Sequence, residues 1–171
     1  MVRTRIRRLP ARTNSDTLNR LSQLHPKSKG APMIKELCKD TAILSTRCEK
    51  ATAADADLAQ DLVDTLQTLD DAACLAANQI GVTKAVVVWM SDDGAYHVMF
   101  NPRIMMGLRA GKATETCLTL DEPSKVTRYD KVKVSFDELV DGQLVPRKRD
   151  YVGWEAQMIQ HMVDHCMGKL V

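Results

Sequence analysis

Two histidines near the end of the chain have the spacing of metal ligands on a helix. His161 and His165 lie four residues apart in the stretch QHMVDHCMG (160–168). On an α-helix this spacing puts both imidazole rings on one face, where they can share a metal ion. Met162 follows the first histidine, at the position where a metallohydrolase with such a pair carries a glutamate. The pair alone is a weak signal, because two structural histidines would give the same pattern.

A cysteine elsewhere in the chain is the candidate third ligand. Cys117 lies in ETCLT (115–119), after an expected strand and turn. A thiolate and two imidazoles leave a fourth position for water, which a hydrolytic metal needs. The metal would lower the pKa of that water to ~7, so that hydroxide forms near neutral pH. Taken alone, Cys117 could equally be a small buried apolar side chain.

The stretch LAANQIG (75–81) adds a candidate oxyanion donor. Ala76 and Ala77 are small enough to let a backbone approach closely, and Gln79 offers a neutral side-chain amide. The alternative is a turn before the next strand, with Gln79 merely solvated.

Together these stretches resemble the three motifs of the peptide deformylase family. The family patterns run GxGLAAxQxG, EGCLS and QHExDH, in this order, against LAANQIG, ETCLT and QHMVDH here. Residues 33–52 are similar to the N-terminal segment of the family, and FNP (100–102) is similar to its INP or FNP. The resemblance covers residues 33–171, and Met33 lies where many members start.

The resemblance implies a fold, a metal and a reaction. The fold would be α+β, with antiparallel sheets wrapped around a central C-terminal helix that carries both histidines. Cys117, His161 and His165 would bind one divalent metal ion, iron(II) in the cell, with zinc, nickel or cobalt as substitutes. Gln79 and the backbone amide of Leu118 would form the oxyanion site. The reaction would remove the formyl group of the N-terminal formyl-methionine from nascent polypeptides.

The resemblance also implies supporting residues and partners. Asp164 matches the Asp of the third motif and would have a structural role. Glu115 matches the Glu of EGCLS, and Arg128 is its candidate partner. The partners would be N-formyl-methionyl nascent peptides and the ribosome, with the protein a monomer or weak dimer.

The chain departs from the family at several positions. Met162 replaces the catalytic Glu, and a thioether neither takes up nor donates a proton. Losing a general acid–base group costs ~10²–10⁴ in rate. Ala72 and Cys74 replace the glycines of GxG. Thr116 replaces the glycine of EGCLS, and Thr119 replaces its serine. Side chains at 74 and 116 would narrow the substrate groove or strain the turn. We therefore expect a deformylase with weakened activity; the alternative is a catalytically inactive, deformylase-like metal- or peptide-binding protein.

The composition is that of one globular domain with a different N-terminal head. Of 171 residues 44% are hydrophobic, and no apolar run approaches the length of a membrane span. Residues 1–32 carry eight Lys or Arg and one acid, which leaves 16 Lys or Arg and 21 acids for the remainder. We interpret 1–32 as a basic, disordered extension or an upstream start before the domain at 33–171. A transit peptide and a nucleic-acid or ribosome-binding arm are the alternatives.

The cysteines indicate the compartment. Five cysteines form no CxxC pair, and their number is odd. This pattern favours a reduced, cytoplasmic setting, or an organelle if the head is a transit peptide.

Helices are predicted before the first motif and at the end of the chain. An apolar stripe over 55–69 predicts a helix, with Thr52 and Asp55 as a capping pair. The stripe comprises Leu58, Leu62, Val63, Leu66 and Leu69. A last helix is predicted over 154–167, followed by Gly168 in a left-handed conformation.

Strands are predicted between these helices. The apolar run 84–90 predicts a buried strand, the turn 91–94 leads to a second strand over 97–101, and alternation predicts a third over 131–136. Asp141-Gly142 predicts a hairpin turn. Strands and helices do not alternate as in a parallel sheet, which also favours an α+β fold.

Overall fold

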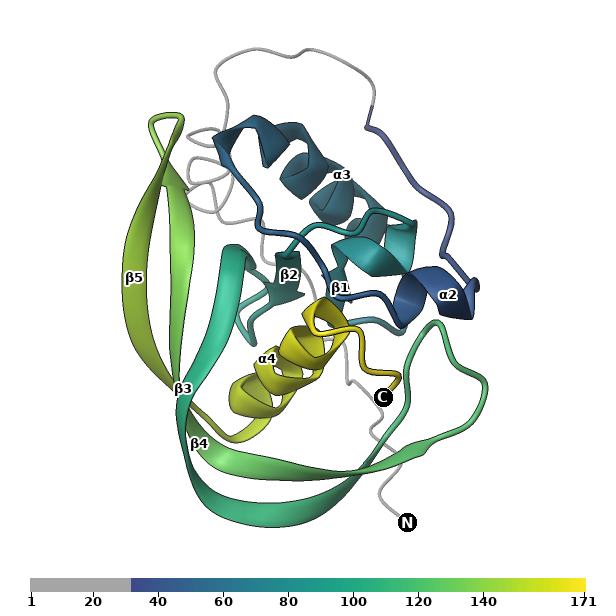
Figure 1. Cartoon of the computed structure of the whole chain (residues 1–171), viewed down its shortest axis with the longest axis vertical. Coiled ribbons are helices and arrows are strands. Elements are labelled where there is room, and N and C mark those ends of the chain that lie inside the picture. The colour runs from purple at the N-terminus through teal and green to yellow at the C-terminus, as the bar shows by residue number, and fades with distance from the viewer. Residues whose placement is uncertain (1–31) are drawn as a thin grey trace.

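A computed structural model describes residues 32–171, which form one five-stranded antiparallel sheet with helices on both faces (Figure 1). The strands follow one another in chain order: β1 (Cys74–Ala76), β2 (Val86–Met90), β3 (Tyr96–Glu115), β4 (Ser124–Val140) and β5 (Gln143–Val152). The helices are α2 (Thr41–Leu44), α3 (Ala56–Gln67), α4 (Gly153–Cys166) and the 3-10 turns η1 (Ala53–Asp55) and η2 (Ala77–Ile80). The predicted basic extension comprises residues 1–32. Apart from Pro32, these residues lie outside the described range.

The two longest strands curve around the last helix. β3 and β4 pair along almost their whole length, and β3 is irregular in register between Phe100 and Arg103 and between Ile104 and Met106. Such irregularities bend a strand and increase its twist. Figure 1 shows the pair sweeping below and beside α4. The predicted α+β fold with a central C-terminal helix is confirmed, as one continuous sheet.

The core has two parts, one on each face of the sheet. On one face of the sheet, Ile159 and Met162 of α4 pack in a cluster with Val87 and Trp89 of β2. α3 covers the other face, where Val86 and Val88 point. Because β2 is buried on both sides, it reads as a continuous apolar run rather than an alternating one.

Several local predictions are confirmed. Thr52 and Asp55 form the expected capping box, directly before α3. Asp141 and Gly142 have φ angles of 49° and 77° in the turn between β4 and β5. Gly168 has a φ of 71°, as expected after a helix C-terminus.

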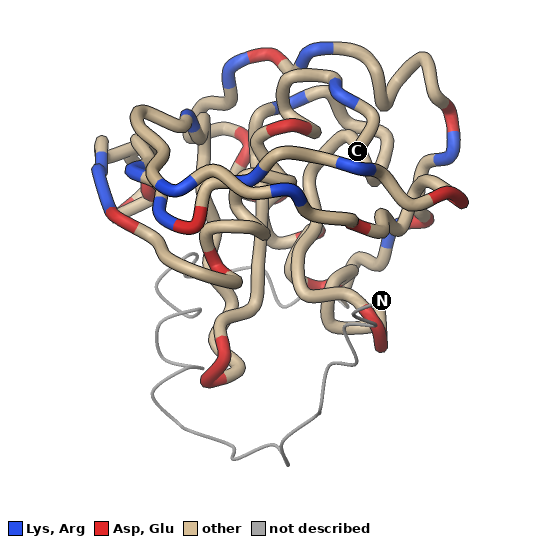
Figure 2. The backbone as a smooth tube through the Cα atoms, turned by 90° about the horizontal axis from the view of Figure 1, so that it is seen from below, with Lys and Arg blue, Asp and Glu red and all other residues tan. Residues whose placement is uncertain are grey.

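The surface carries mixed charge. Acidic and basic positions are interspersed over the face seen in Figure 2. Lys131 and Asp150 pair across β4 and β5 at 2.9 Å, an exposed contact that contributes little to stability. Among the helices of residues 32–171, none has the length and apolar composition needed to cross a membrane.

Candidate active site

The central helix α4 brings the two histidines together on its buried face. The Nε2 atoms of His161 and His165 are 3.2 Å apart, and the ring centroids are 4.8 Å apart. Both side chains are buried, with 8% and 1% of their surface exposed. The spacing of four residues therefore puts both imidazole rings on one face of the helix, as predicted.

Cys117 joins the pair from the segment that follows β3. Its Sγ lies 3.3 Å from the Nε2 of His165, and the donor atoms of Cys117, His161 and His165 all lie within 4.8 Å of one another. Cys117 is the least buried of the three. Access to the site therefore runs past Cys117 rather than along the helix.

The three donors fit a tetrahedral metal ion. With metal–nitrogen and metal–sulfur bonds of about 2.0–2.1 and 2.3 Å, tetrahedral angles put two nitrogens about 3.3 Å apart and a sulfur about 3.5 Å from a nitrogen. The distances of 3.2 Å between the histidines and 3.3 Å between Cys117 and His165 are close to both values. Two of the three donor pairs therefore have the spacing of a tetrahedral site, and the third pair, Cys117 and His161, lies within 4.8 Å.

Glu115 orients the first histidine. Its Oε2 lies 2.9 Å from the Nδ1 of His161, which leaves Nε2 facing the other donors. Arg128 binds the same carboxylate through two hydrogen bonds of 2.8 and 2.7 Å. Burial opposes ionisation of Glu115, but the hydrogen bonds from Arg128 and His161 outweigh it and lower the pKa of the carboxyl to about 2. The predicted pairing of Glu115 with Arg128 is confirmed.

The carboxylate of Asp164 binds basic side chains rather than the three donor residues. Its carboxylate accepts a hydrogen bond of 2.6 Å from Arg128 and one of 2.8 Å from Lys169. This agrees with a structural role, because Asp164 secures the arginine that secures Glu115.

The metal-free donors form a charged network. Burial raises the pKa of Cys117, but hydrogen bonds from His161 and His165 outweigh this and lower it to about 5. Burial lowers the pKa of His161, but Cys117 and Glu115 outweigh this and raise it to about 9. A thiolate at neutral pH is the form that binds metals.

Gln79 points its amide N–H group at the donors. Its Oε1 accepts a hydrogen bond of 3.0 Å from the backbone N–H of Ala76, which fixes the side chain. Its Nε2 lies 3.4 Å from both Cys117 Sγ and Thr119 Oγ1. Gln79 is only 1% exposed, so the solvated alternative is wrong.

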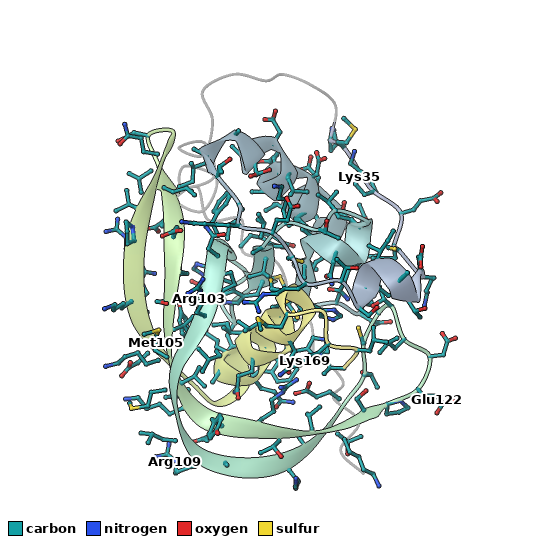
Figure 3. The ribbon with its side chains drawn as sticks, in the orientation of Figure 1. Lys35, Arg103, Met105, Arg109, Glu122 and Lys169 are labelled. Carbon is teal, nitrogen blue, oxygen red and sulfur yellow. The ribbon has the colours of Figure 1, made fainter. Side chains whose placement is uncertain are left out.

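Leu118 follows Cys117 directly in the chain and lies beside the donor group. Its carbonyl oxygen accepts a hydrogen bond of 3.2 Å from Lys39 Nζ. Within residues 32–171 no hydrogen bond is found from the Leu118 backbone N–H, so this group is available to a ligand. The loop then runs through Glu122, which projects at the edge of the molecule (Figure 3).

Met162 lies in the apolar core rather than in a polar pocket. It is 1% exposed and belongs to the cluster between α4 and the sheet. Among residues 32–171, the only carboxylate bonded to a donor residue is Glu115, which is occupied by His161, Arg128 and Gln157. No carboxylate of the described chain therefore takes the position of the missing glutamate.

The substitutions for family glycines do not strain the backbone. Cys74 and Thr116 are absent from the described non-glycine residues with positive φ, which are Asn101, Arg109 and Asp141. A strained, positive-φ backbone is therefore absent at these two positions, and a narrowed substrate groove stays a prediction. Burial and the charges on Cys117 and Glu115 raise the pKa of Cys74 to about 12, so its thiol stays protonated beside the site.

Two contributors were not identified from the sequence. Thr119 Oγ1 lies 3.2 Å from Cys117 Sγ and stabilises its thiolate, and Gln157 Nε2 donates to Glu115 at 2.9 Å. Thr119 was noted in the sequence only as the replacement for the serine of EGCLS, and its contact with the thiolate was not predicted. Gln157 had a weak signal, because it precedes His161 by one helical turn.

The fold and the site define a class of protein. Residues 32–171 have an α+β fold in which the central helix and one loop present a Cys–His–His donor set. Three protein ligands are the number found in hydrolytic metal centres. The family model described as polypeptide deformylase matches residues 34–171. The chain therefore belongs to the polypeptide deformylase family, whose members are metal-dependent.

Curated relatives agree with this assignment. The chain is 34% identical over 140 residues to the peptide deformylase of Clostridium beijerinckii, a match that covers 81% of this chain and 100% of that protein. It is also 34% identical over 133 residues to peptide deformylase 1 of Bacillus subtilis, covering 75% and 81% of the two chains.

Solved structures show the same fold. A peptide deformylase from Legionella pneumophila matches with a TM-score of 0.70 and 27% identity, over 80% of this chain and 83% of that one. An actinonin-bound class I type b peptide deformylase from Acinetobacter baumannii matches with a TM-score of 0.65 and 27% identity, over 81% and 93%.

Proposed function

We propose that this protein hydrolyses the N-formyl group of formyl-methionine at the N-terminus of nascent polypeptides, with weakened turnover. The observation that carries the proposal is the convergence of Cys117, His161 and His165 on one point, with the Gln79 amide directed at the same point. Formate and a free amino terminus would be the products.

The three donors would hold one divalent ion, with iron(II) proposed in the cell and zinc, nickel or cobalt as substitutes. When bound, such an ion supplies Lewis acidity, which lowers the pKa of a water and polarises a carbonyl. Glu115 keeps the Nδ1 side of His161 occupied, so that Nε2 remains the ligand atom.

Gln79 and Leu118 are the proposed catalytic residues. The Nε2 of Gln79 and the backbone N–H of Leu118 would donate to the oxygen that becomes negative as the formyl carbon is attacked. The side chain of Gln79 is positioned in advance, because its Oε1 accepts a hydrogen bond from the backbone N–H of Ala76. Preorganised donors of this kind are worth about 10²–10³ in kcat each.

The weakened turnover follows from Met162. A proton must leave the attacking water and reach the leaving amine. Neither the thioether of Met162 nor the side-chain amide of Gln79 can carry that proton. Glu115 and Asp164 are held by Arg128, so they do not substitute. The proton therefore has to move through solvent at the Cys117 side of the site.

The proposed setting is the cytoplasm, with N-formyl-methionyl nascent chains as substrates. We also propose association with the ribosome and a monomeric or weakly dimeric state.

The decisive experiment compares the wild-type protein with Met162→Glu. Both are purified anaerobically, their bound metal is quantified, and formate release from a formyl-Met tripeptide is measured. We expect about one metal per chain in both, and kcat/KM about 10²–10⁴ higher in the glutamate variant. Met162→Gln is the matched control, because glutamine has nearly the size of glutamate but carries an amide that does not take up a proton. This variant should remain slow.

Two results would contradict the proposal. A wild-type rate equal to that of the glutamate variant would mean that another group carries the proton. The absence of metal, together with no effect of Cys117→Ala, would remove the site itself. Full metal occupancy and tight peptide binding without turnover would instead favour a deformylase-like binding protein.

A further inference from the structure

Two cysteines outside the metal site lie against each other at the end of α4. The backbone N–H of Cys48 donates a hydrogen bond of 2.9 Å to the carbonyl oxygen of Cys166. With standard bond lengths this contact keeps the two Cα atoms less than about 7 Å apart. Cα atoms more than about 7 Å apart cannot be bridged by a disulfide without backbone movement, so this pair is within range.

Both side chains lie in the same apolar region. Cys48 packs against the same apolar cluster to which Cys166 belongs. The neighbouring Cys166 thiol lowers the pKa of Cys48 despite the burial of Cys48, which agrees with the short backbone contact between the two residues. Neither sulfur belongs to the donor group of Cys117, His161 and His165.

The backbone around the pair is held from both sides. The segment of Cys48 is attached to the start of β2, since Glu49 N–H donates to Thr83 and Glu49 accepts from Ala85, both at 2.9 Å. Cys166 is the last residue of α4. Lys169, labelled in Figure 3, lies just beyond this helix end. The two sulfurs are therefore presented by rigid elements and not by loose ends.

We propose that Cys48 and Cys166 form a reversible disulfide, a redox modification that ties the C-terminal end of α4 to the segment before η1. This inference is independent of the proposed activity, because neither Cys48 nor Cys166 belongs to the metal-donor set.

A low-molecular-weight disulfide would supply the oxidising equivalents. The Cys48 thiolate attacks one sulfur of that disulfide and expels one thiol, which leaves a mixed disulfide on Cys48. Cys166 then attacks the Cys48 sulfur, loses its proton and expels the second thiol. Cys48 is half-buried and Cys166 only 6% exposed, so Cys48 is the residue that meets the reagent and Cys166 the one that resolves.

The bridge would act on the part of α4 that carries the second histidine. His165 directly precedes Cys166, and its carbonyl oxygen already accepts a hydrogen bond of 2.9 Å from Asn78 Nδ2. Closing the bridge would add a covalent restraint next to this contact. The oxidised protein should therefore unfold at a higher temperature than the reduced protein.

The test uses the full chain, loaded with metal to shield Cys117. The protein is equilibrated in glutathione buffers from fully reduced to fully oxidised, quenched in acid, alkylated and mapped by peptide mass spectrometry without reduction. We expect loss of two of the five alkylatable thiols, a peptide cross-linked through Cys48 and Cys166, and full reversal by dithiothreitol.

Variants separate this pairing from general oxidation. Cys48→Ser should abolish the cross-link and the rise in Tm, with Cys166 still a free thiol. Cys166→Ala should leave Cys48 carrying glutathione, and Cys38→Ser, the control, should retain the cross-link. The proposal is overturned if both thiols stay alkylatable in the most oxidising buffer. It is equally overturned if wild-type Cys48 carries glutathione while Cys166 stays free, or if the bridge involves Cys74 or Cys117 instead.

Discussion

The Oε2 of Glu115 lies 2.9 Å from the Nδ1 of His161 and so determines which nitrogen of that histidine faces the site. Arg128 holds the carboxylate through two hydrogen bonds and also binds Asp164, which lies three residues after the histidine on the same helix. The end of β3, the strand β4 and the helix α4 are joined by this network. The first ligand is therefore oriented by three elements at once.

Removing the charge of Glu115 should weaken metal binding. Partners behind a ligating histidine typically contribute a factor of about 10–100 in metal affinity. We expect Glu115→Gln to raise the metal dissociation constant by about that factor in a competitive chelator titration. Glu122→Gln, in the exposed loop, is the control and should leave the constant unchanged. Equal affinities in wild type and Glu115→Gln would show that Arg128 alone maintains the geometry.

Cys117 should be a thiolate in the metal-free protein well below neutral pH. Its pKa is lowered to about 5, so the reactive form predominates above that pH and disappears as the pH falls below it. Alkylation by iodoacetamide should therefore show a midpoint near pH 5, and bound metal should suppress it. Cys74, whose pKa is raised to about 12, should stay unmodified at neutral pH. A midpoint for Cys117 near that of an ordinary thiol would contradict the network.

The hydroxyl of Thr119 should contribute to that low pKa. It lies 3.2 Å from Cys117 Sγ, and a hydrogen bond to a charged group is worth about 1.5–3 kcal/mol, or about one to two pKa units. Thr119→Val should raise the alkylation midpoint of the metal-free protein by about one unit or more. Thr119→Ser keeps the hydroxyl and should preserve the midpoint. A Val variant that titrates like wild type would assign the whole effect to the histidines.

Gly168 should be required for stability. It has a φ of 71°, and a Cβ there would lie 2.4 Å from the carbonyl oxygen of Ser45. Gly168→Ala should reduce the free energy of unfolding by more than about 1 kcal/mol, measured by urea denaturation. In Gly111→Ala the new Cβ meets nothing within 4 Å, so stability should hardly change. Similar losses in both variants would show that the contact with Ser45 is not the cause, because the effect of an added Cβ on the unfolded chain is stabilising.

Much of this protein could be predicted from short stretches. The turn at Asp141-Gly142, the cap at Thr52 and the left-handed Gly168 depend on backbone conformations that only a few residue types favour, so local sequence determined them. The set of Cys117, His161, His165 and Gln79 was likewise visible, because each motif had its own local pattern.

The lengths of β3 and β4 could not be predicted. Only residues 97–101 and 131–136 looked like strands, yet the strands run over Tyr96–Glu115 and Ser124–Val140. Their outer halves are largely exposed and mix apolar with polar residues, so hydrophobic periodicity gives no clear signal there. They are strands because each pairs with the other across the sheet, which is a tertiary relationship.

Sequence by itself determined the family motifs and the donor residues, because their identities and local spacing carry that information. Only the tertiary structure decided the environment of each. It buried Met162 in the apolar core, attached Glu115 to His161 and placed Cys48 beside Cys166, 118 positions later in the chain. These contacts join residues that are distant in sequence, and they depend on how the sheet curves around α4.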